Sequence, residues 1–254
     1  MESLKGKLVF ITGASSGIGA ACARAFAQEG ARLLLAARRL DRLESLAEEL
    51  KGVCEVHCFS LDVSRRTEVE EKLAGLPPGW REIDVLVNNA GLSRGLDKLH
   101  EADIGDWEEM IDTNLKGLLY VSRAVIPGMV ERGRGQVLNL GSIAGHEAYP
   151  GGSVYCATKH AVTALTKALR MDLLGTPIRV SSVDPGMVET EFSLVRFHGD
   201  EKKAAKVYEG LTPLTPEDVA EVLLFCATRP PHVNLSEVMV LPTAQASALL
   251  SHRK

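Results

Sequence analysis

Short apolar runs alternate with longer helix-like segments along nearly the whole chain. The runs are rich in Val, Ile and Leu and occur at Leu8–Thr12, Leu33–Ala37, Val53–Leu61, Val85–Asn88, Gln136–Leu140, Ile178–Val183 and Val238–Leu241. Between them, apolar residues recur at helical spacing over approximately Ile18–Glu29, Leu40–Leu50, Arg65–Leu73, Trp107–Arg132, Ser153–Leu174 and Pro216–Arg229. Strands that are apolar on both faces belong in a parallel sheet covered by helices on both sides. The alternation therefore predicts an α/β fold with a doubly wound parallel sheet of about seven strands, flanked by helices.

Length and charge narrow the class of protein. The chain has 254 residues, 45% of them hydrophobic, and no internal repeat or linker divides it, so we expect a single domain over residues 1–254. With 29 basic and 33 acidic residues the net charge is −4, which argues against a nucleic-acid partner. Because no apolar run approaches the roughly 20 residues that span a bilayer, and the start lacks a signal-peptide pattern, we expect no membrane association and a cytoplasmic location.

The cysteines do not predict a disulfide framework or a metal site. Their number, five, is odd, and their surroundings are apolar, which is typical of reduced core residues. The one cluster to test is Cys54, His57 and Cys58. If this segment is a strand, the two cysteines face one side and His57 faces the other, so the three cannot converge on a metal.

A glycine-rich loop follows the first apolar run. It reads Thr12-Gly13-Ala14-Ser15-Ser16-Gly17-Ile18-Gly19 and leads into a predicted helix. Backbone amides at such a helix start can hold a pyrophosphate. The spacing departs from the G-x-G-x-x-G fingerprint, because Cys22 stands where a third small residue is expected.

Tyr155 and Lys159 lie four residues apart in a predicted helix, thirteen residues and more after Ser142. Their side chains would share one helix face, with Cβ atoms about 5–6 Å apart. At roughly 4 Å and an effective dielectric near 20, the attraction is about 4 kcal/mol, enough to lower a tyrosine pKa from about 10 toward neutrality. Such a group suits general acid/base catalysis. Since helices also carry such pairs by chance, the surrounding motifs must decide whether Tyr155 and Lys159 form a catalytic pair.

Several motifs together resemble the short-chain dehydrogenases/reductases in order and spacing, from Leu4 to about Pro242. They are Thr12 with Gly13, Gly17 and Gly19, then Asn88-Asn89-Ala90-Gly91, Asn114, Ser142, Tyr155 with Lys159, and Pro185-Gly186. The resemblance implies a Rossmann-like fold whose N-terminal half binds a nicotinamide cofactor, with a substrate loop around residues 187–212.

The resemblance implies a catalytic set of Asn114, Ser142, Tyr155 and Lys159. Ser142 would hydrogen-bond the substrate oxygen, and Tyr155 would donate the proton to it during carbonyl reduction. Lys159 would hold the ribose hydroxyls and lower the Tyr155 pKa, while Asn114 would relay protons from water. An amide inside a helix can compete for backbone bonds and open the helix locally. From the residues alone, Asn114 is a surface helix position.

The implied cofactor contacts follow the strand ends: Gly13, Ser15, Ser16, Gly17, Ile18, Gly19, Arg38, Arg39, Asp62, Val63, Asn89, Ala90, Gly91, Tyr155, Lys159, Pro185, Gly186, Val188 and Thr190. Asp62 resembles the family's adenine contact, with a cap for the following helix as its structural alternative. Asn89 resembles the residue that closes over the cofactor, although Asn-Ala-Gly also makes tight turns.

The end of the second apolar run bears on the choice of cofactor. Sites that prefer NAD place a carboxylate there for the ribose 2′-hydroxyl, whereas an arginine accommodates a 2′-phosphate. Here Ala37 holds that position and Arg38 and Arg39 follow it. Two guanidinium groups could grip a phosphate, so NADP(H) is favoured, with solvated turn residues as the alternative.

Four stretches look like the NADP-dependent 3-hydroxy acid dehydrogenases, which act on serine, allo-threonine and acids such as 3-hydroxypropionate: Trp80–Leu92, Asp106–Asn114, Pro185–Phe197 and Leu241–Ser247. The segment Cys156–Val162 is closer to the general family pattern, and His146–Tyr149 beside Ser142 could reshape the pocket. A substrate carboxylate needs a cation, for which we select Arg196, with a surface arginine as the alternative.

Two other functions stay open. The apolar loop residues Met187 and Phe192 would equally suit a broad-specificity carbonyl reductase for ketones, aldehydes or steroid-type substrates. A non-catalytic nucleotide-binding protein would be expected to have lost part of the catalytic set, which is complete here. Family members usually pair the helices at Trp107–Arg132 and Ser153–Leu174, so the resemblance implies a homotetramer.

Overall fold

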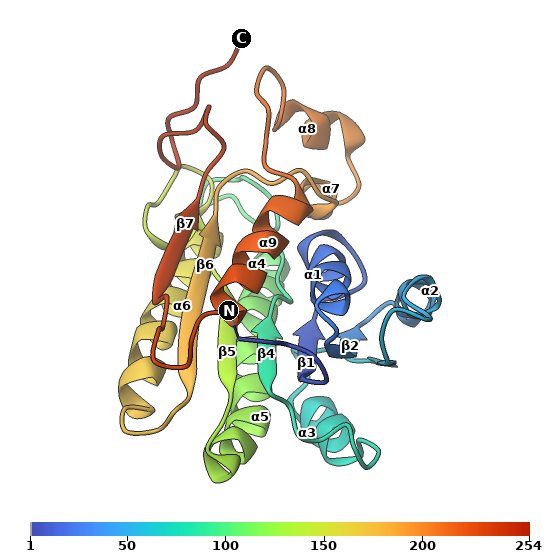
Figure 1. The fold of residues 1–254 in the computed structure, drawn as a ribbon. Coiled ribbons are helices and arrows are strands. Elements are labelled where there is room, and N and C mark those ends of the chain that lie inside the picture. Colours follow the sequence, from blue (N-terminus) through green and yellow to red (C-terminus); the bar gives the residue numbers. More distant parts are fainter. Residues whose placement is uncertain (1) are drawn as a thin grey trace.

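The protein is described by a computed structural model that covers residues 2–254. A 7-stranded, fully parallel sheet forms its centre, with strand order β3-β2-β1-β4-β5-β6-β7 (Figure 1). The strands are β1 (Leu8–Thr12), β2 (Arg32–Ala37), β3 (Val56–Ser60), β4 (Val85–Asn88), β5 (Gln136–Leu140), β6 (Arg179–Pro185) and β7 (Glu237–Val240). This is the doubly wound sheet that the alternating pattern predicted.

Helices cover both faces of the sheet (Figure 1). They are α1 (Gly17–Gln28), α2 (Leu40–Glu49), α3 (Arg66–Ala74), α4 (Ile104–Ile111), α5 (Leu118–Arg132), α6 (Ser153–Asp172), α7 (Phe192–Arg196), α8 (Glu201–Lys206) and α9 (Pro216–Ala227). A π-helical segment, η1 (Asp112–Gly117), joins α4 to α5, and a 3₁₀ turn, η2 (Ile143–Gly145), follows β5.

An apolar core lies on each face of the sheet. Buried residues of α1, α2 and α9 pack with Val9 and Ile11 of β1 in one core. Residues of α3 and α5 pack with Leu8 and Phe10 of the same strand in the other. Successive residues of β1 therefore face opposite layers, and all five are buried.

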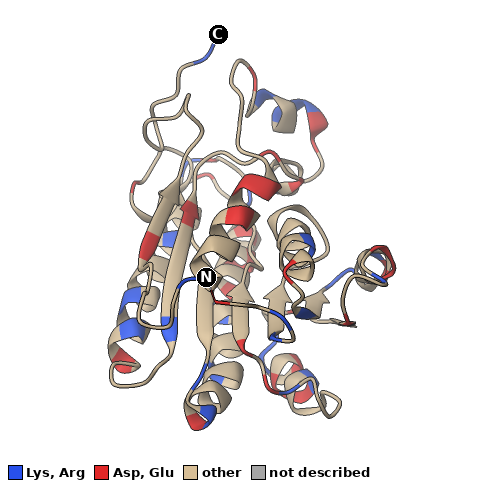
Figure 2. Ribbon diagram, in the orientation of Figure 1, with Lys and Arg blue, Asp and Glu red and all other residues tan. Residues whose placement is uncertain are grey.

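The central strands carry no charged residue, and the basic and acidic side chains lie mainly on helices and loops (Figure 2). Both signs are interspersed there, in keeping with the small net charge. Within residues 2–254, no helix is both long enough and apolar enough to cross a membrane.

Several predicted elements differ from the structure in their bounds, and three of these differences bear on the argument. β3 starts at Val56 rather than Val53, because residues 51–54 form a turn after α2. Cys54 therefore lies outside the strand, and the argument from its facing direction does not apply to it. The single helix predicted at Trp107–Arg132 begins earlier, at Ile104, and is interrupted by η1. β6 runs on to Pro185 and so carries the chain to the edge of the site.

Candidate active site

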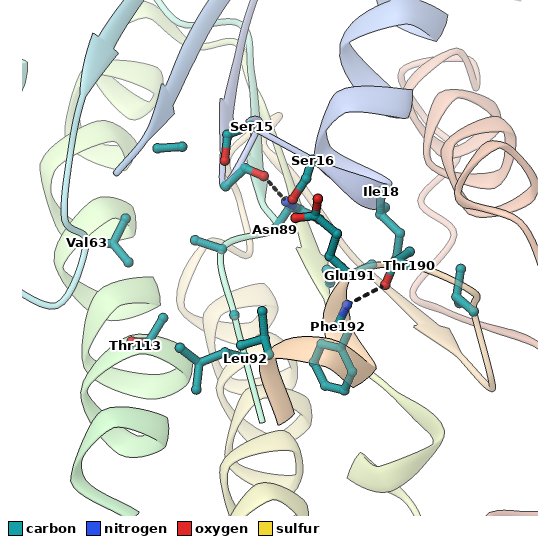
Figure 3. Close-up of a pocket in the computed structure, with 18 of the residues that line it drawn as sticks. Ser15, Ser16, Ile18, Val63, Asn89, Leu92, Thr113, Thr190, Glu191 and Phe192 are labelled. Carbon is teal, nitrogen blue, oxygen red and sulfur yellow. Dashed lines mark hydrogen bonds between the residues drawn. The ribbon is translucent and has the colours of Figure 1, made fainter. Parts of the chain in front are cut away.

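A cavity of about 330 Å³ opens where the parallel strands end. Its walls come from the loops after β1 to β6, the edge at which parallel α/β sheets bind ligands. Figure 3 shows Val63 and Thr113 at the left of this space and Ile18, Thr190 and Phe192 at its right. Residues of the first and last of these loops thus lie around one space although they are far apart in sequence.

Most of the predicted cofactor residues line this cavity: Gly13, Ser15, Ser16, Gly17, Ile18, Arg38, Arg39, Asp62, Val63, Asn89, Ala90, Gly91, Tyr155, Lys159, Pro185, Gly186, Val188 and Thr190. Gly19 is absent from the lining because it faces the loop backbone. A Cβ added to Gly19 would lie only 2.4 Å from the carbonyl oxygen of Gly13. The structure thus gives Gly19 a packing role.

The glycine-rich loop is tied to the end of β4. The side-chain amide of Asn89 donates to the carbonyl oxygens of Thr12 (2.8 Å) and Gly13 (3.1 Å). The Thr12 hydroxyl oxygen in turn accepts hydrogen bonds from the backbone N–H groups of Asn89 and Ala90, both at 3.1 Å. Gly13 needs its glycine, since its φ is +67° and a Cβ would sit 2.9 Å from the Ala90 Cα. Asn89 therefore holds the loop in shape and also lines the cavity.

The start of α1 fits a phosphate group. Ser16 is the N-cap residue, and its side chain makes no cap hydrogen bond among the described residues, so it does not occupy the first-turn N–H groups. No acidic residue lies in that first turn. Free amides and the positive end of the helix dipole together favour an anion at this point.

Asp62 lines the same cavity but does not cap a helix. Its carboxylate accepts hydrogen bonds from the backbone N–H (3.0 Å) and hydroxyl (2.7 Å) of Ser64. α3 begins later, at Arg66. The structural alternative predicted for Asp62 is therefore wrong, and its carboxylate fixes the turn that follows β3.

Tyr155 and Lys159 lie on one face of α6, as their spacing predicted, and both are buried. The ammonium nitrogen of Lys159 lies 5.9 Å from the centroid of the Tyr155 ring. It donates a hydrogen bond to the carbonyl oxygen of Leu140 at the end of β5 (2.8 Å). Helix α6 thus brings both side chains to the strand end that precedes Ser142.

Burial, rather than Lys159, determines the direction in which the pKa of Tyr155 shifts. Desolvation raises the pKa of Tyr155 well above its ordinary value, with Tyr149 adding to the rise and Arg196 and Ser142 opposing it. The predicted lowering of this pKa toward neutrality is therefore wrong in this structure. Burial also lowers the pKa of Lys159 to about 8, an effect that the carboxylate of Asp184 opposes.

Ser142 and Asn114 approach the pair from two sides. Ser142 caps η2, and its hydroxyl oxygen accepts the backbone N–H of Ala144 (3.1 Å). Asn114 lies in the π-helical segment, where the helix is locally widened, and it is buried rather than at the surface. Its side chain exchanges two 2.8 Å hydrogen bonds with the backbone of Leu92 and also donates to the hydroxyl of Thr158.

Asn114 makes no direct hydrogen bond to Lys159 among the described residues, but both approach Gly91. A Cβ added to Gly91 would lie 3.2 Å from Oδ1 of Asn114 and 3.8 Å from Nζ of Lys159. Ser142, Tyr155 and Lys159 line the cavity, whereas Asn114 lies behind its wall.

Arg196 ends the short helix α7 and lies next to Tyr155. Its guanidinium carbon is 5.4 Å from the Tyr155 ring centroid, and one Nη donates to the Tyr149 hydroxyl at 3.2 Å. The Nε of Arg196 is buried and has no hydrogen-bond partner among the described residues. Phe192 and Val195 of the same helix line the cavity, whereas Arg196 itself does not.

Sequence reasoning missed several residues of the cavity wall: Leu61, Leu92, Thr113, Leu140, Gly141, Glu191 and Val195. Ala37 and Phe192, which were considered for cofactor choice and for the substrate, also line it. Most of the missed residues adjoin residues that were predicted, so the strand ends would have identified them by position. Phe192 and Val195 belong to α7, which five residues of sequence did not reveal.

Comparisons with known proteins agree with this arrangement. The family model for short chain dehydrogenases matches residues 7–199. An NADP-dependent 3-hydroxy acid dehydrogenase of Salmonella typhi is 51% identical over 248 residues, covering 97% of this chain and 99% of that protein. Sulfoacetaldehyde reductase 2 of Chromohalobacter salexigens is 48% identical over 240 residues, covering 94% and 95%. The solved closed form of serine dehydrogenase complexed with NADP+ has a TM-score of 0.92 and 47% identity, and the match covers 97% and 100%.

Proposed function

The chain belongs to the short-chain dehydrogenase family, and we propose that it moves hydride between NADP(H) and the hydroxyl or carbonyl carbon of a 3-hydroxy acid or its 3-oxo counterpart. Serine, allo-threonine and 3-hydroxypropionate are the candidate substrates. The observation that carries this proposal is the burial of Tyr155 and Lys159 in a cavity that also contains the glycine-rich loop.

NADP(H), when bound, supplies or accepts the hydride. In carbonyl reduction, the Tyr155 hydroxyl donates the proton to the substrate oxygen, and Ser142 donates a hydrogen bond to the same oxygen. Because burial raises the Tyr155 pKa, the phenol is protonated at neutral pH, which is the form that a proton donor needs. Oxidation needs the same group as a base.

Lys159 and Asn114 support this pair. The ammonium of Lys159 holds the ribose hydroxyls, and its hydrogen bond to Leu140 fixes its direction. The proposed proton path to water passes Gly91, where Asn114 and Lys159 approach the same side of the loop.

Two features support NADP(H) over NAD(H). Ala37 leaves no carboxylate at the end of β2, and Arg38 and Arg39 line the cavity directly after it. A 2′-phosphate at this point would meet two guanidinium groups. The relatives named above as NADP-dependent or bound to NADP+ agree with this preference.

Arg196 is the proposed partner of the substrate carboxylate. Its unpaired buried Nε and its position 5.4 Å from the Tyr155 ring support this role. The relatives named for 3-hydroxy acid and sulfoacetaldehyde also take substrates that carry an acidic group.

The test is Arg196→Gln, assayed with 3-hydroxy acids and with uncharged ketones, each with NADP(H) and NAD(H). Loss of a charge-assisted hydrogen bond should raise KM for the 3-hydroxy acid about tenfold or more and leave KM for an uncharged ketone within about twofold. Lys202→Gln, which removes an exposed positive charge from α8 in the same loop, is the control and should change neither. An unchanged KM for the acid in Arg196→Gln would remove the carboxylate role.

A broad-specificity carbonyl reductase is the second candidate. It is favoured by the apolar side of the cavity, where Leu92, Phe192 and Val195 line the space near Tyr155. Assays of the wild-type chain with 3-hydroxy acids and with ketones decide between the two functions, because a broad-specificity carbonyl reductase would prefer bulky ketones to 3-hydroxy acids. A protein that only binds the nucleotide would turn over neither.

A homotetramer in the cytoplasm completes the proposal. Apolar side chains are exposed on the helices that the family pairs, with Leu119 and Val130 on α5 and Met171 on α6 among them. Light scattering coupled to size exclusion measures the assembly, and a monomeric mass would contradict it.

A further inference from the structure

Arg38 and Arg39, which follow β2, are each paired with a carboxylate from a distant part of the chain. Arg39 Nη1 lies 2.9 Å from Oε2 of Glu191, and Arg42 Nη1 lies 2.7 Å from Oε1 of the same residue. Arg38 Nη1 lies 3.5 Å from the carboxylate of Glu109. The guanidinium groups that would receive a 2′-phosphate thus already have anionic partners.

Of the two carboxylates, Glu191 lies closer to these arginines. It immediately precedes α7, about 150 residues along the chain from Arg39, and lines the same cavity as the arginine. Arg39 also donates to the hydroxyls of Ser15 (3.1 Å) and Ser16 (2.7 Å), so one guanidinium joins Glu191 to the glycine-rich loop. Figure 3 shows the Glu191 side chain beside Ser16.

The carboxyl group is ionised at neutral pH. Hydrogen bonds from Arg42 and then Arg39 hold its pKa below the ordinary value. A carboxylate with two guanidinium partners presents the same kind of negative oxygen pair that a phosphate would offer to Arg39. Two such anions cannot both take Nη1 of Arg39 without repelling each other.

We propose that Glu191 is a specificity-determining residue, which competes with the cofactor's 2′-phosphate for Arg39. The inference rests on the proposed use of NADP(H). In the free protein Glu191 ties the segment before α7 to α2 through Arg39 and Arg42. A 2′-phosphate takes over Arg39, while a cofactor that lacks this phosphate leaves the carboxylate where it is. Part of the binding free energy of the phosphate is therefore spent on separating Glu191 from Arg39.

The experiment compares Glu191→Gln with the wild-type chain in fluorescence titrations with NADPH and NADH at low ionic strength, without substrate. Glutamine keeps the size and polarity of the side chain but removes its charge. An exposed ion pair contributes up to about 1 kcal/mol, so the dissociation constant for NADPH should fall about two- to fivefold. That for NADH should change less, so the preference for NADPH should increase.

Glu189→Gln is the matched control. Glu189 lies two residues away on the same segment, is exposed, and makes no ion pair within residues 2–254. The Glu189→Gln variant removes the same charge and should leave the dissociation constants for NADPH and NADH unchanged. Thermal unfolding of each variant checks that the fold is kept.

Three results would overturn the inference: NADPH binding in Glu191→Gln that is unchanged or weaker, equal tightening for NADH, or equal tightening in Glu189→Gln. Failure of the wild-type chain to bind NADPH at all would instead contradict the proposed cofactor. The two failures are therefore distinct.

Discussion

Lys159 carries a cation inside the protein, and this has a consequence for stability. Its side chain is buried, its pKa is lowered to about 8, and it rests on one backbone carbonyl. An unfolded lysine has its ordinary pKa near 10.5. Between these two values the unfolded chain binds more protons than the folded one, so the contribution of Lys159 to the free energy of unfolding becomes more favourable as the pH rises.

We predict that Lys159→Met lacks this dependence. The difference in free energy of unfolding between variant and wild type should shift by roughly 2–3 kcal/mol from pH 7 to about pH 10, in favour of the wild type. Tyr155, whose pKa burial also raises, is present in both proteins, so its own contribution to the pH dependence cancels in this difference. Denaturant titrations at several pH values measure the difference, and a constant difference would show that Lys159 has an ordinary pKa.

Residue types and spacing indicated which side chains could meet, but not their electrostatics. The four-residue spacing placed Tyr155 and Lys159 on one helix face, and this is confirmed. The direction of the tyrosine pKa was wrong, because a spacing argument contains no burial. Glu191 could not be foreseen either, since its partners lie about 150 residues away.

At the scale of elements, α7 is a helix of five residues held by its neighbours. Arg94 donates to the carbonyl oxygen of Val195 (2.6 Å), near the end of α7, and forms an ion pair with Glu109 of α4 (2.6 Å). The backbone N–H of Gly95 donates to the carbonyl oxygen of Arg196. So short a helix is unstable alone, and these contacts fix it over Tyr155.

We predict that Arg94→Gln disturbs the substrate side of the cavity. Loss of its charge-assisted hydrogen bonds should lower kcat/KM for the best substrate about tenfold or more and leave NADPH binding within about twofold. Arg123→Gln, on the exposed side of α5, removes the same charge as a control. Steady-state kinetics and NADPH titration give both quantities, and an unchanged kcat/KM would mean that α7 does not depend on Arg94.

The sequence predicted best those elements that have a clear apolar pattern of their own. β1, β4 and β5 have the bounds that their apolar runs predicted. α7 and α8 were missed, because helices of five and six residues are too short to show an amphipathic pattern. β3 was predicted three residues too long at its start, because Val53 and Cys54 are apolar but belong to a turn.

At the scale of the whole molecule, the sheet order explains why the cavity exists. β1 and β4 are neighbours in the sheet. The chain runs from β1 to β2 on one side and from β4 to β5 on the other, so the two connections leave in opposite directions. The first loop supplies Gly13, the loop after β4 supplies Asn89, and the loop after β6 supplies Thr190. Continuous apolar strands predicted this sheet, but the covering of the cavity depends on contacts between distant loops.

The central claim is that this assembled cleft transfers a proton through Tyr155, and turnover of Tyr155→Phe tests it most directly. The variant loses one hydroxyl and keeps the ring that packs against Phe192. The account predicts that its fold and NADPH affinity stay as in the wild type, while turnover falls by about 10²–10⁴, as for a lost general acid. Near-normal turnover in Tyr155→Phe, with NADPH bound as in the wild type, would contradict it.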